Sequence, residues 1–126
     1  MTPSLIKSFP VLAPILGRRF VKFTGLNNQI ALAVAGDAII GVSDSVGALN
    51  AGDLCDVHMS GLYEVEAGAA FAAGEMLSAD ATGRAIKAVA NGANPVTVGA
   101  RANGAATQAG DYINAIISVY RTPLGA

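Results

Sequence analysis

The stretch Leu54-Cys-Asp-Val-His-Met-Ser-Gly-Leu-Tyr-Glu-Val-Glu-Ala67 decides the fold class. In its first half the apolar side chains, Cys55 among them, fall on one face, and the polar ones, His58 among them, fall on the other. This alternation is typical of a half-buried β-strand. Ser60-Gly61 in the middle of the stretch suits a tight turn. We therefore predict an antiparallel hairpin, with a buried cysteine beside an exposed histidine.

The rest of the chain continues in short alternating runs, each ended by glycine, asparagine or aspartate. Asp80-Ala-Thr-Gly83 reads as another turn between two strands, and the alanine-rich stretch 66–75 reads as an extended loop. The predicted strands span residues 19–24, 30–35, 38–43, 54–59, 62–67, 76–79, 85–89, 96–101 and 112–120.

The sequence also repeats itself weakly at one constant offset, which is the separation between Ala51 and Ala109. Ala51-Gly52-Asp53 matches Ala109-Gly110-Asp111, Gly41 matches Gly99, and the same offset relates Thr24-Gly25 to Thr82-Gly83 and Asn50 to Gln108. Two copies are too few for a solenoid, but they suffice for a pseudo-symmetric domain. We therefore expect a mainly β fold, a small antiparallel β-barrel or sandwich built from two related β-units that share one core.

The N-terminal stretch, residues 1–17, has a different character, because Pro3, Pro10 and Pro14 interrupt scattered apolar side chains. Proline resists both a continuous helix and a central strand. The expected organisation is an extended N-terminal arm, residues 1–17, followed by a single β-domain, residues 18–126.

The composition is oily for a protein with an exposed surface. Hydrophobic residues make up 52% of the 126 residues and charged residues only 13%, which indicates that partners bury part of the surface. The single cysteine excludes an intrachain disulfide, and one histidine leaves a metal cage short of ligands. No apolar run reaches the roughly 18 residues of a membrane span, and no cofactor is implied.

The net charge of −1 hides a sharp segregation along the chain. Residues 1–22 carry +4, residues 23–83 carry eight carboxylates and no Lys or Arg, and the remainder carries +3. A nucleic-acid binder would show a sustained basic face with stacking aromatics, so no nucleic-acid partner is expected. The basic residues near the start also invert the charge order of a secretory signal, so we expect an intracellular product.

Catalytic constellations are not convincing. Cys55 and His58, three apart on one strand, point to opposite faces and cannot act as thiol and base. Glu64 and Glu66 share a strand face at a spacing that paired glycosidase carboxylates span, yet a solvated or interface-facing edge explains them better. Calcium binding by Asp37, Asp44, Asp53 or Asp56 lacks the loop pattern that such sites use. The sequence favours a protein that is not an enzyme.

The stretch from Gly61 to Arg84 resembles the central pattern of the capsid cement, or head decoration, proteins of tailed bacteriophages. Its Gly-Leu-Tyr-Glu-Val strand, its Ala-Phe-Ala-Ala-Gly-Glu turn and its Asp-Ala-Thr-Gly-Arg turn stand in the family's order. Ile39-Ile-Gly-Val-Ser43 and Val98-Gly-Ala100, each followed by an Ala-Gly-Asp turn, resemble further elements. The resemblance covers about residues 30–120 and implies no catalytic residues.

The resemblance implies a structural protein on the outer surface of the capsid, made in the bacterial host cytoplasm. Its expected partners are the major capsid protein of the expanded head and other copies of itself, a trimer first and a dimer second. The hypothesised capsid or subunit interface consists of apolar arm residues, the basic residues beside them and acidic strand residues: Lys7, Phe9, Val11, Leu12, Ile15, Leu16, Arg18, Arg19, Asp56, Glu64 and Glu66. The alternative is a virion-surface ligand-binding module that recognises glycans, and a hydrolase using Glu64 and Glu66 is a third reading.

Overall fold

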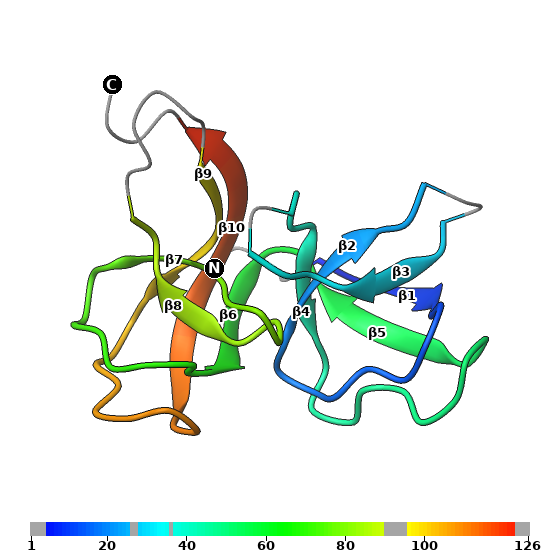
Figure 1. The fold of residues 1–126 in the computed structure, drawn as a ribbon, viewed down its shortest axis with the longest axis horizontal. Coiled ribbons are helices and arrows are strands. Elements are labelled where there is room, and N and C mark those ends of the chain that lie inside the picture. The colour runs from blue at the N-terminus through cyan, green and yellow to red at the C-terminus, as the bar shows by residue number, and fades with distance from the viewer. Residues whose placement is uncertain (1–4, 26–27, 36, 90–95, 123–126) are drawn as a thin grey trace.

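The computed structural model describes residues 5–25, 28–35, 37–89 and 96–122. They contain no helix and form two five-stranded antiparallel sheets, which lie side by side as two lobes (Figure 1). The first sheet contains β1 (Ile6–Pro10), β2 (Phe20–Phe23), β3 (Ile30–Leu32), β4 (Gly41–Ser43) and β5 (Leu54–His58). The second contains β6 (Gly61–Glu66), β7 (Met76–Ala79), β8 (Ala85–Lys87), β9 (Val96–Ala102) and β10 (Tyr112–Thr122).

The two sheets have the same topology. The strand order is β1-β5-β4-β2-β3 in the first sheet and β6-β10-β9-β7-β8 in the second, so each strand of one sheet has a counterpart at the same place in the other. We call residues 6–58 the first unit and residues 61–122 the second unit. The prediction of two related β-units is confirmed.

Isolated bridges repeat along with the strands. Ile15 bridges Ala48 in the first unit, and Phe71 bridges Ala106 in the second. Before β2 and β7, equivalent residues of the two units are therefore as far apart in the sequence as Ile15 and Phe71. Towards the last strand they are separated as Ala48 is from Ala106, which is the offset seen in the sequence.

The turn before the last strand of each unit repeats as well. The amide of Gly52 donates to the carbonyl of Val11 and that of Gly110 donates to the carbonyl of Ala67, both at 2.8 Å. Both glycines have positive φ, a conformation that side chains disfavour. The repeated Ala-Gly-Asp tripeptides thus build the same turn twice.

The prediction of one shared core is wrong: each unit has a core of its own, and only the second core extends across the boundary between the units. The first cluster lies within the first unit: Phe9, Val11, Ile15, Val21, Ile30, Ala48, Cys55 and Val57. The second cluster fills the second unit with Val65, Phe71, Leu77, Ile117 and many alanines, and adds Phe20, Ala33, Ile39 and Val42 of the first unit. Because the outer face of one sheet packs onto the other sheet, the fold is sandwich-like and not a closed barrel.

The arm predicted from the prolines differs from the structure. It is extended, as expected, but residues 6–10 form β1, which pairs with β5 from Ile6↔His58 to Pro10↔Leu54. β1 lies at the edge of its sheet, where a proline does not interrupt a ladder on both sides. Residues 6–10 of the arm are therefore an edge strand of the first unit.

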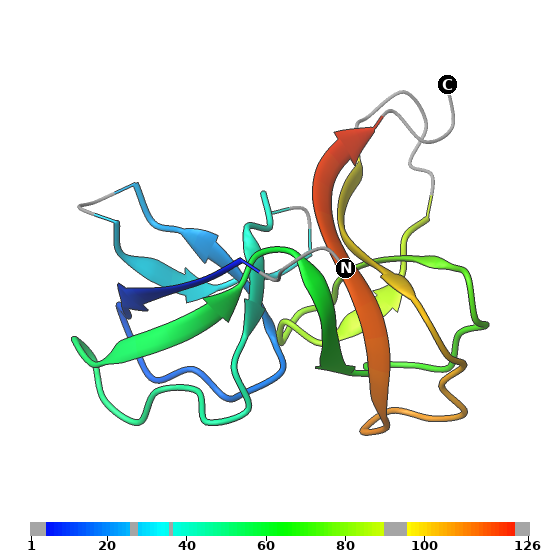
Figure 2. The same cartoon turned by 180° about the vertical axis from the view of Figure 1, so that it is seen from behind.

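The hairpin predicted at Ser60-Gly61 is wrong. The two strands exist, but β5 pairs with β1 and β4, whereas β6 pairs with β10. Gly61, with φ of 94°, lies where the chain passes from one sheet to the other, and Figure 2 shows β5 and β6 running into separate lobes. Alternation gave the strands correctly, but it carries no information about their partners.

The expected exposed histidine is also wrong, although Cys55 is buried as predicted. His58 is only 7% exposed, because the outer face of β5 is covered by the second unit at this point. Its ring stacks on Tyr63 of β6 with 3.6 Å between ring centroids. Burial raises the pKa of the Cys55 thiol to about 11, so the thiol stays protonated at neutral pH.

Candidate functional site

The junction between the two units gathers most of the charged side chains that the sequence singled out. The segment before β2 runs beside the edge strand β6, and the amide of Glu66 donates to the carbonyl of Arg18 at 3.0 Å. Consecutive arginines at 18 and 19 thereby reach alternate carboxylates on β6. The two arginines that follow the arm and the two glutamates of β6 therefore form ion pairs within one chain.

Arg18 occupies an unusual backbone position. Its φ is 61°, and its counterpart in the second unit, separated from it as Phe71 is from Ile15, is Gly74 with φ of 89°. The guanidinium lies 3.0 Å from Glu64 and 4.3 Å from the ring centroid of Tyr112. Partial burial lowers the pKa of Arg18, but the hydrogen bond and charge of Glu64 outweigh it, so the pKa is raised. Arg18 thus adopts a backbone conformation that favours glycine, and its side chain links the first unit to two residues of the second.

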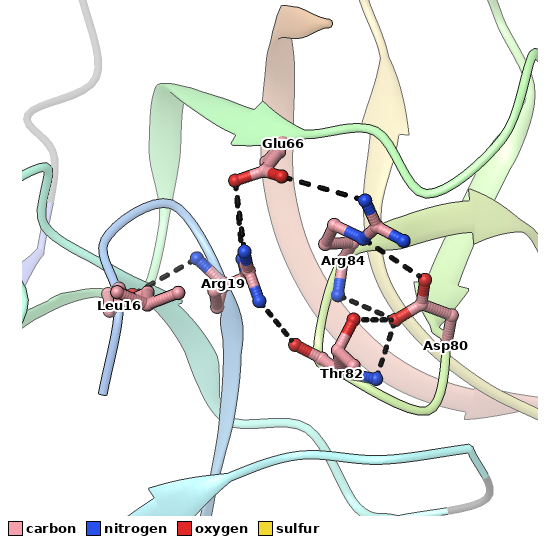
Figure 3. Close-up of polar contacts among 7 residues, drawn as sticks. Leu16, Arg19, Glu66, Asp80, Thr82 and Arg84 are labelled. Carbon is pink, nitrogen blue, oxygen red and sulfur yellow. Dashed lines mark hydrogen bonds and ion pairs between the residues drawn. The ribbon is translucent and has the colours of Figure 1, made fainter. Parts of the chain in front are cut away.

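Arg19 joins a second ionic cluster (Figure 3). Its guanidinium lies 3.2 Å from Glu66 and donates to the carbonyl of Thr82 at 2.8 Å, while Glu66 also faces Arg84 at 3.8 Å. Asp80 accepts from the amides of Thr82 and Arg84 at 2.8 and 2.9 Å, closing the turn between β7 and β8. This cluster fixes the start of β2 onto the second unit.

A third contact across the junction centres on Asp44. Its carboxylate lies 2.9 Å from His58 Nε2 and accepts from the hydroxyl of Tyr63 at 3.3 Å. The same hydroxyl accepts from the amide of Ser45 at 2.7 Å. The hydrogen bond with His58 is the main reason why the pKa of Asp44 lies below its ordinary value, against the opposing effect of burial. The contact ties the loop after β4 to β6.

A hollow opens beside these contacts, where the loops of the first unit meet the start of β10. Large apolar side chains stand around it: Leu16 is 66% exposed, Val46 79%, Leu49 81% and Tyr112 55%. We call this surface, with Arg18 at its base, the junction groove. An exposed apolar surface of this kind marks an interaction site in many soluble proteins.

The same loops of the second unit have a different chemistry. Applying the offsets of the repeat, the counterpart of Leu16 is Ala72, that of Val46 is Gly104 and that of Leu49 is Thr107. The fold therefore does not require bulky apolar residues at these places. Bulky apolar residues thus stand at these three loop positions in the first unit, and small or polar residues stand there in the second.

The structure divides the predicted interface residues into three groups. Phe9, Val11 and Ile15 are buried in the core of the first unit. Arg18, Arg19, Glu64 and Glu66 pair with one another. Lys7, Leu12, Leu16 and Asp56 are exposed, and of these only Leu16 lines the junction groove.

Val46, Leu49 and Tyr112 were missed at the sequence level. The internal repeat contained the signal for the two loop residues, because a bulky apolar residue in one copy stands against a small or polar one in the other. Tyr112 carries no such signal, since its place beside Arg18 depends on the packing of the units.

The described residues contain no cluster of three or more His, Cys, Asp or Glu side chains arranged to ligate a metal ion. None of the described segments is a helix long and apolar enough to cross a bilayer. The described part of the junction is thus made of ion pairs, aromatic contacts and exposed apolar side chains.

Comparisons with known proteins identify a similar fold and a protein family. No curated protein matches the chain significantly. The crystal structure of the head fiber gp8.5 N base in bacteriophage phi29 has a similar fold, with a TM-score of 0.68 and 20% sequence identity over 92% of this chain and 95% of that chain. The phage cement protein family matches residues 14–117, which is most of the chain and most of each β-unit. The chain therefore belongs to the phage cement protein family, a family of capsid-associated structural proteins and not of enzymes.

Proposed function

We propose that the protein binds the outer surface of the expanded phage head and stabilises contacts between major capsid protein subunits there. Family membership supports a capsid partner. The observation that carries the proposal is the junction groove, whose Leu16, Val46 and Leu49 side chains are exposed in one unit and absent from the same loops of the other. The protein would be made in the host cytoplasm and end on the virion.

Such a protein acts by mass action. If it binds the expanded shell and not its precursor or its dissociated subunits, each bound copy favours the expanded shell. Many weak contacts on one lattice then add up to a large effect. The apolar side chains of the groove would supply the contact area, and the ion pairs at its base would hold the two units in the geometry that the lattice requires.

Other exposed residues from the sequence hypothesis can extend this contact. Leu12 lies on the same loop as Leu16, and it is 54% exposed. Lys7 and Asp56 are exposed on paired strands at the edge of the first unit. We propose that they contact capsid or sister subunits, and that the protein works as a homo-oligomer, with a trimer as the first expectation and a dimer as the second.

The test uses undecorated, expanded heads and purified protein. Leu49→Asp puts a charge on the most exposed apolar side chain of the groove, and we expect binding to weaken at least about tenfold, which corresponds to roughly 1.4 kcal/mol. Ala72→Asp is the matched control, because it puts the same charge on an exposed loop position of the second unit, and Ala72 is the counterpart of Leu16 in the groove. Co-sedimentation with heads measures both.

Equal binding by wild type, Leu49→Asp and Leu49→Asp/Val46→Asp would refute the junction groove as the capsid contact. Loss of binding in Ala72→Asp as well would show that charge on the loops in general is responsible. If wild-type protein leaves expanded heads undecorated, the cement function itself fails for this chain.

A further inference from the structure

The outer faces of the two sheets can be compared residue by residue. On each sheet, four side chains lie in one row across neighbouring strands, as the registers show. In the first unit the row consists of Ile6, His58, Val42 and Phe20. In the second unit the equivalent row consists of Leu62, Ile116, Arg101 and Met76.

The two rows have opposite environments. In the first unit Val42 and Phe20 are almost fully buried, because the second unit covers them. In the second unit Ile116 is 47% exposed and Arg101 is exposed too. A shallow hollow lined by Ala100, Arg101, Ile116 and Ser118 opens there. The same structural face is thus covered once and left open once.

We propose that the outer row of the second unit binds the first unit of another copy of this chain. The fold itself shows what covers this kind of face. Within the chain, the row of one β-unit is covered by the next β-unit, and a second copy would bring the next unit in the series. Arginine beside apolar side chains also has the composition of a protein interface.

The contact inside the chain predicts which residues meet between copies. The second unit covers the first row with Tyr63, which stacks on His58, and with Gly99, where an added Cβ would lie 2.6 Å from the ring of Phe20. In the first unit, the counterpart of Tyr63 is Lys7. The counterpart of Gly99 is Ile40, because Val21 pairs with Gly41 where Leu77 pairs with Ala100, so the register moves the sequence match of Gly41 with Gly99 by one residue.

These counterparts fit the open row. Lys7 is exposed and its aliphatic stem can lie on Ile116, in place of the two stacked rings. Ile40 is partly buried and would meet Met76, so two side chains of medium size replace a phenylalanine packed on a glycine. A contact between different faces of two copies is heterologous, and it closes into a ring or continues as a filament.

This inference builds on the oligomer part of the proposed function, and its test needs no heads, so the two can fail separately. Single cysteines are placed at exposed positions, Lys7→Cys in one preparation and Ile116→Cys in another, and the two are mixed with a short bismaleimide. The native Cys55 is buried with a raised pKa, so it reacts slowly. We expect cross-linked dimers in the mixture and only monomers in each preparation alone.

Cross-linking of Ile116→Cys alone would overturn the heterologous contact in favour of a symmetric one. Cross-linking of a control mixture of Leu49→Cys and Ile116→Cys to the same extent would show that collision suffices, which also overturns it. Analytical ultracentrifugation supplies an independent measure. Ile116→Asp should raise the dissociation constant of the oligomer at least about tenfold, whereas Leu49→Asp should leave it at the wild-type value. A wild-type protein that stays monomeric would refute the proposal.

Discussion

At the scale of single residues, Arg18 combines an unfavourable backbone with favourable side-chain contacts. A non-glycine residue with positive φ costs about 1 kcal/mol relative to glycine, and the second unit avoids this cost with Gly74. The first unit keeps arginine there and gains contacts with Glu64 and Tyr112. The side chain, and not the turn, explains why the residue is not a glycine.

This balance predicts the order of stability of two variants. Arg18→Ala keeps the strained φ and loses both contacts, whereas Arg18→Gly loses the contacts but relieves the strain. We expect Arg18→Gly to be more stable than Arg18→Ala by about 1 kcal/mol, with both below wild type by a modest amount, because the ion pair is partly exposed. Urea unfolding measures the three proteins. Equal stability of the two variants would show that the backbone at residue 18 is unstrained.

Asp44 predicts a pH dependence of stability. Its pKa is lowered from 3.8 in the folded protein, so the unfolded chain takes up the proton more readily, and folding gains stability from the carboxylate above about pH 4. This contribution is lost as the pH falls through the lowered pKa. Asp44→Asn lacks the titrating group, so its unfolding free energy should fall less steeply than that of wild type below pH 4. Parallel curves for the two proteins would contradict the prediction.

At the scale of elements, the sequence predicted which residues form strands better than it predicted which strands pair. All nine strands read from alternation and turn residues exist, and the repeat predicted the two-unit plan. β1 was missed as a strand because Pro10 excludes a central strand, whereas an edge strand tolerates proline. The hairpin at Ser60-Gly61 and the exposure of His58 failed because both depend on which sheet packs where, a long-range outcome that local pattern does not encode.

The candidate site shows the same limit. Arg18, Arg19, Glu64 and Glu66 were singled out by charge segregation, and the structure does bring them together, but as partners of one another. The local sequence does not distinguish Phe9, Val11 and Ile15 from exposed apolar residues such as Leu16. Only the three-dimensional position separates an apolar residue that fills the core from one that faces outward.

The packing of β9 against β2 predicts the effect of one methyl group. A Cβ at Gly99 would lie 2.6 Å from the Phe20 ring and 3.1 Å from Ile39, and Phe20 is 1% exposed and has no room to move. We expect Gly99→Ala to destabilise the protein by about 1–3 kcal/mol. Gly104→Ala is the matched control, because its Cβ would make an ordinary 3.7 Å contact with Ile113. Thermal unfolding compares the two, and equal melting temperatures would argue against tight packing at the junction.

At the scale of the whole molecule, the arm belongs to the folding unit. Phe9, Val11 and Ile15 are each no more than 3% exposed, and burying each such side chain contributes about 1.5–3 kcal/mol, while a whole domain is stable by only about 5–15 kcal/mol. We propose that the chain folds as one unit that includes β1. A truncated protein that lacks residues 1–17 should show no cooperative unfolding transition by circular dichroism. A truncated protein with the wild-type transition would restore the view of the arm as a separate docking segment.

The unequal loops of the two units have a consequence for geometry. A repeat with identical halves could lie on a lattice equally well in two orientations, related by exchange of the halves. Because the three groove positions carry bulky side chains in the earlier half and small or polar ones in the later half, that ambiguity is removed, and the two ends of the molecule become distinguishable. Every copy bound through the same loops would then point the same way.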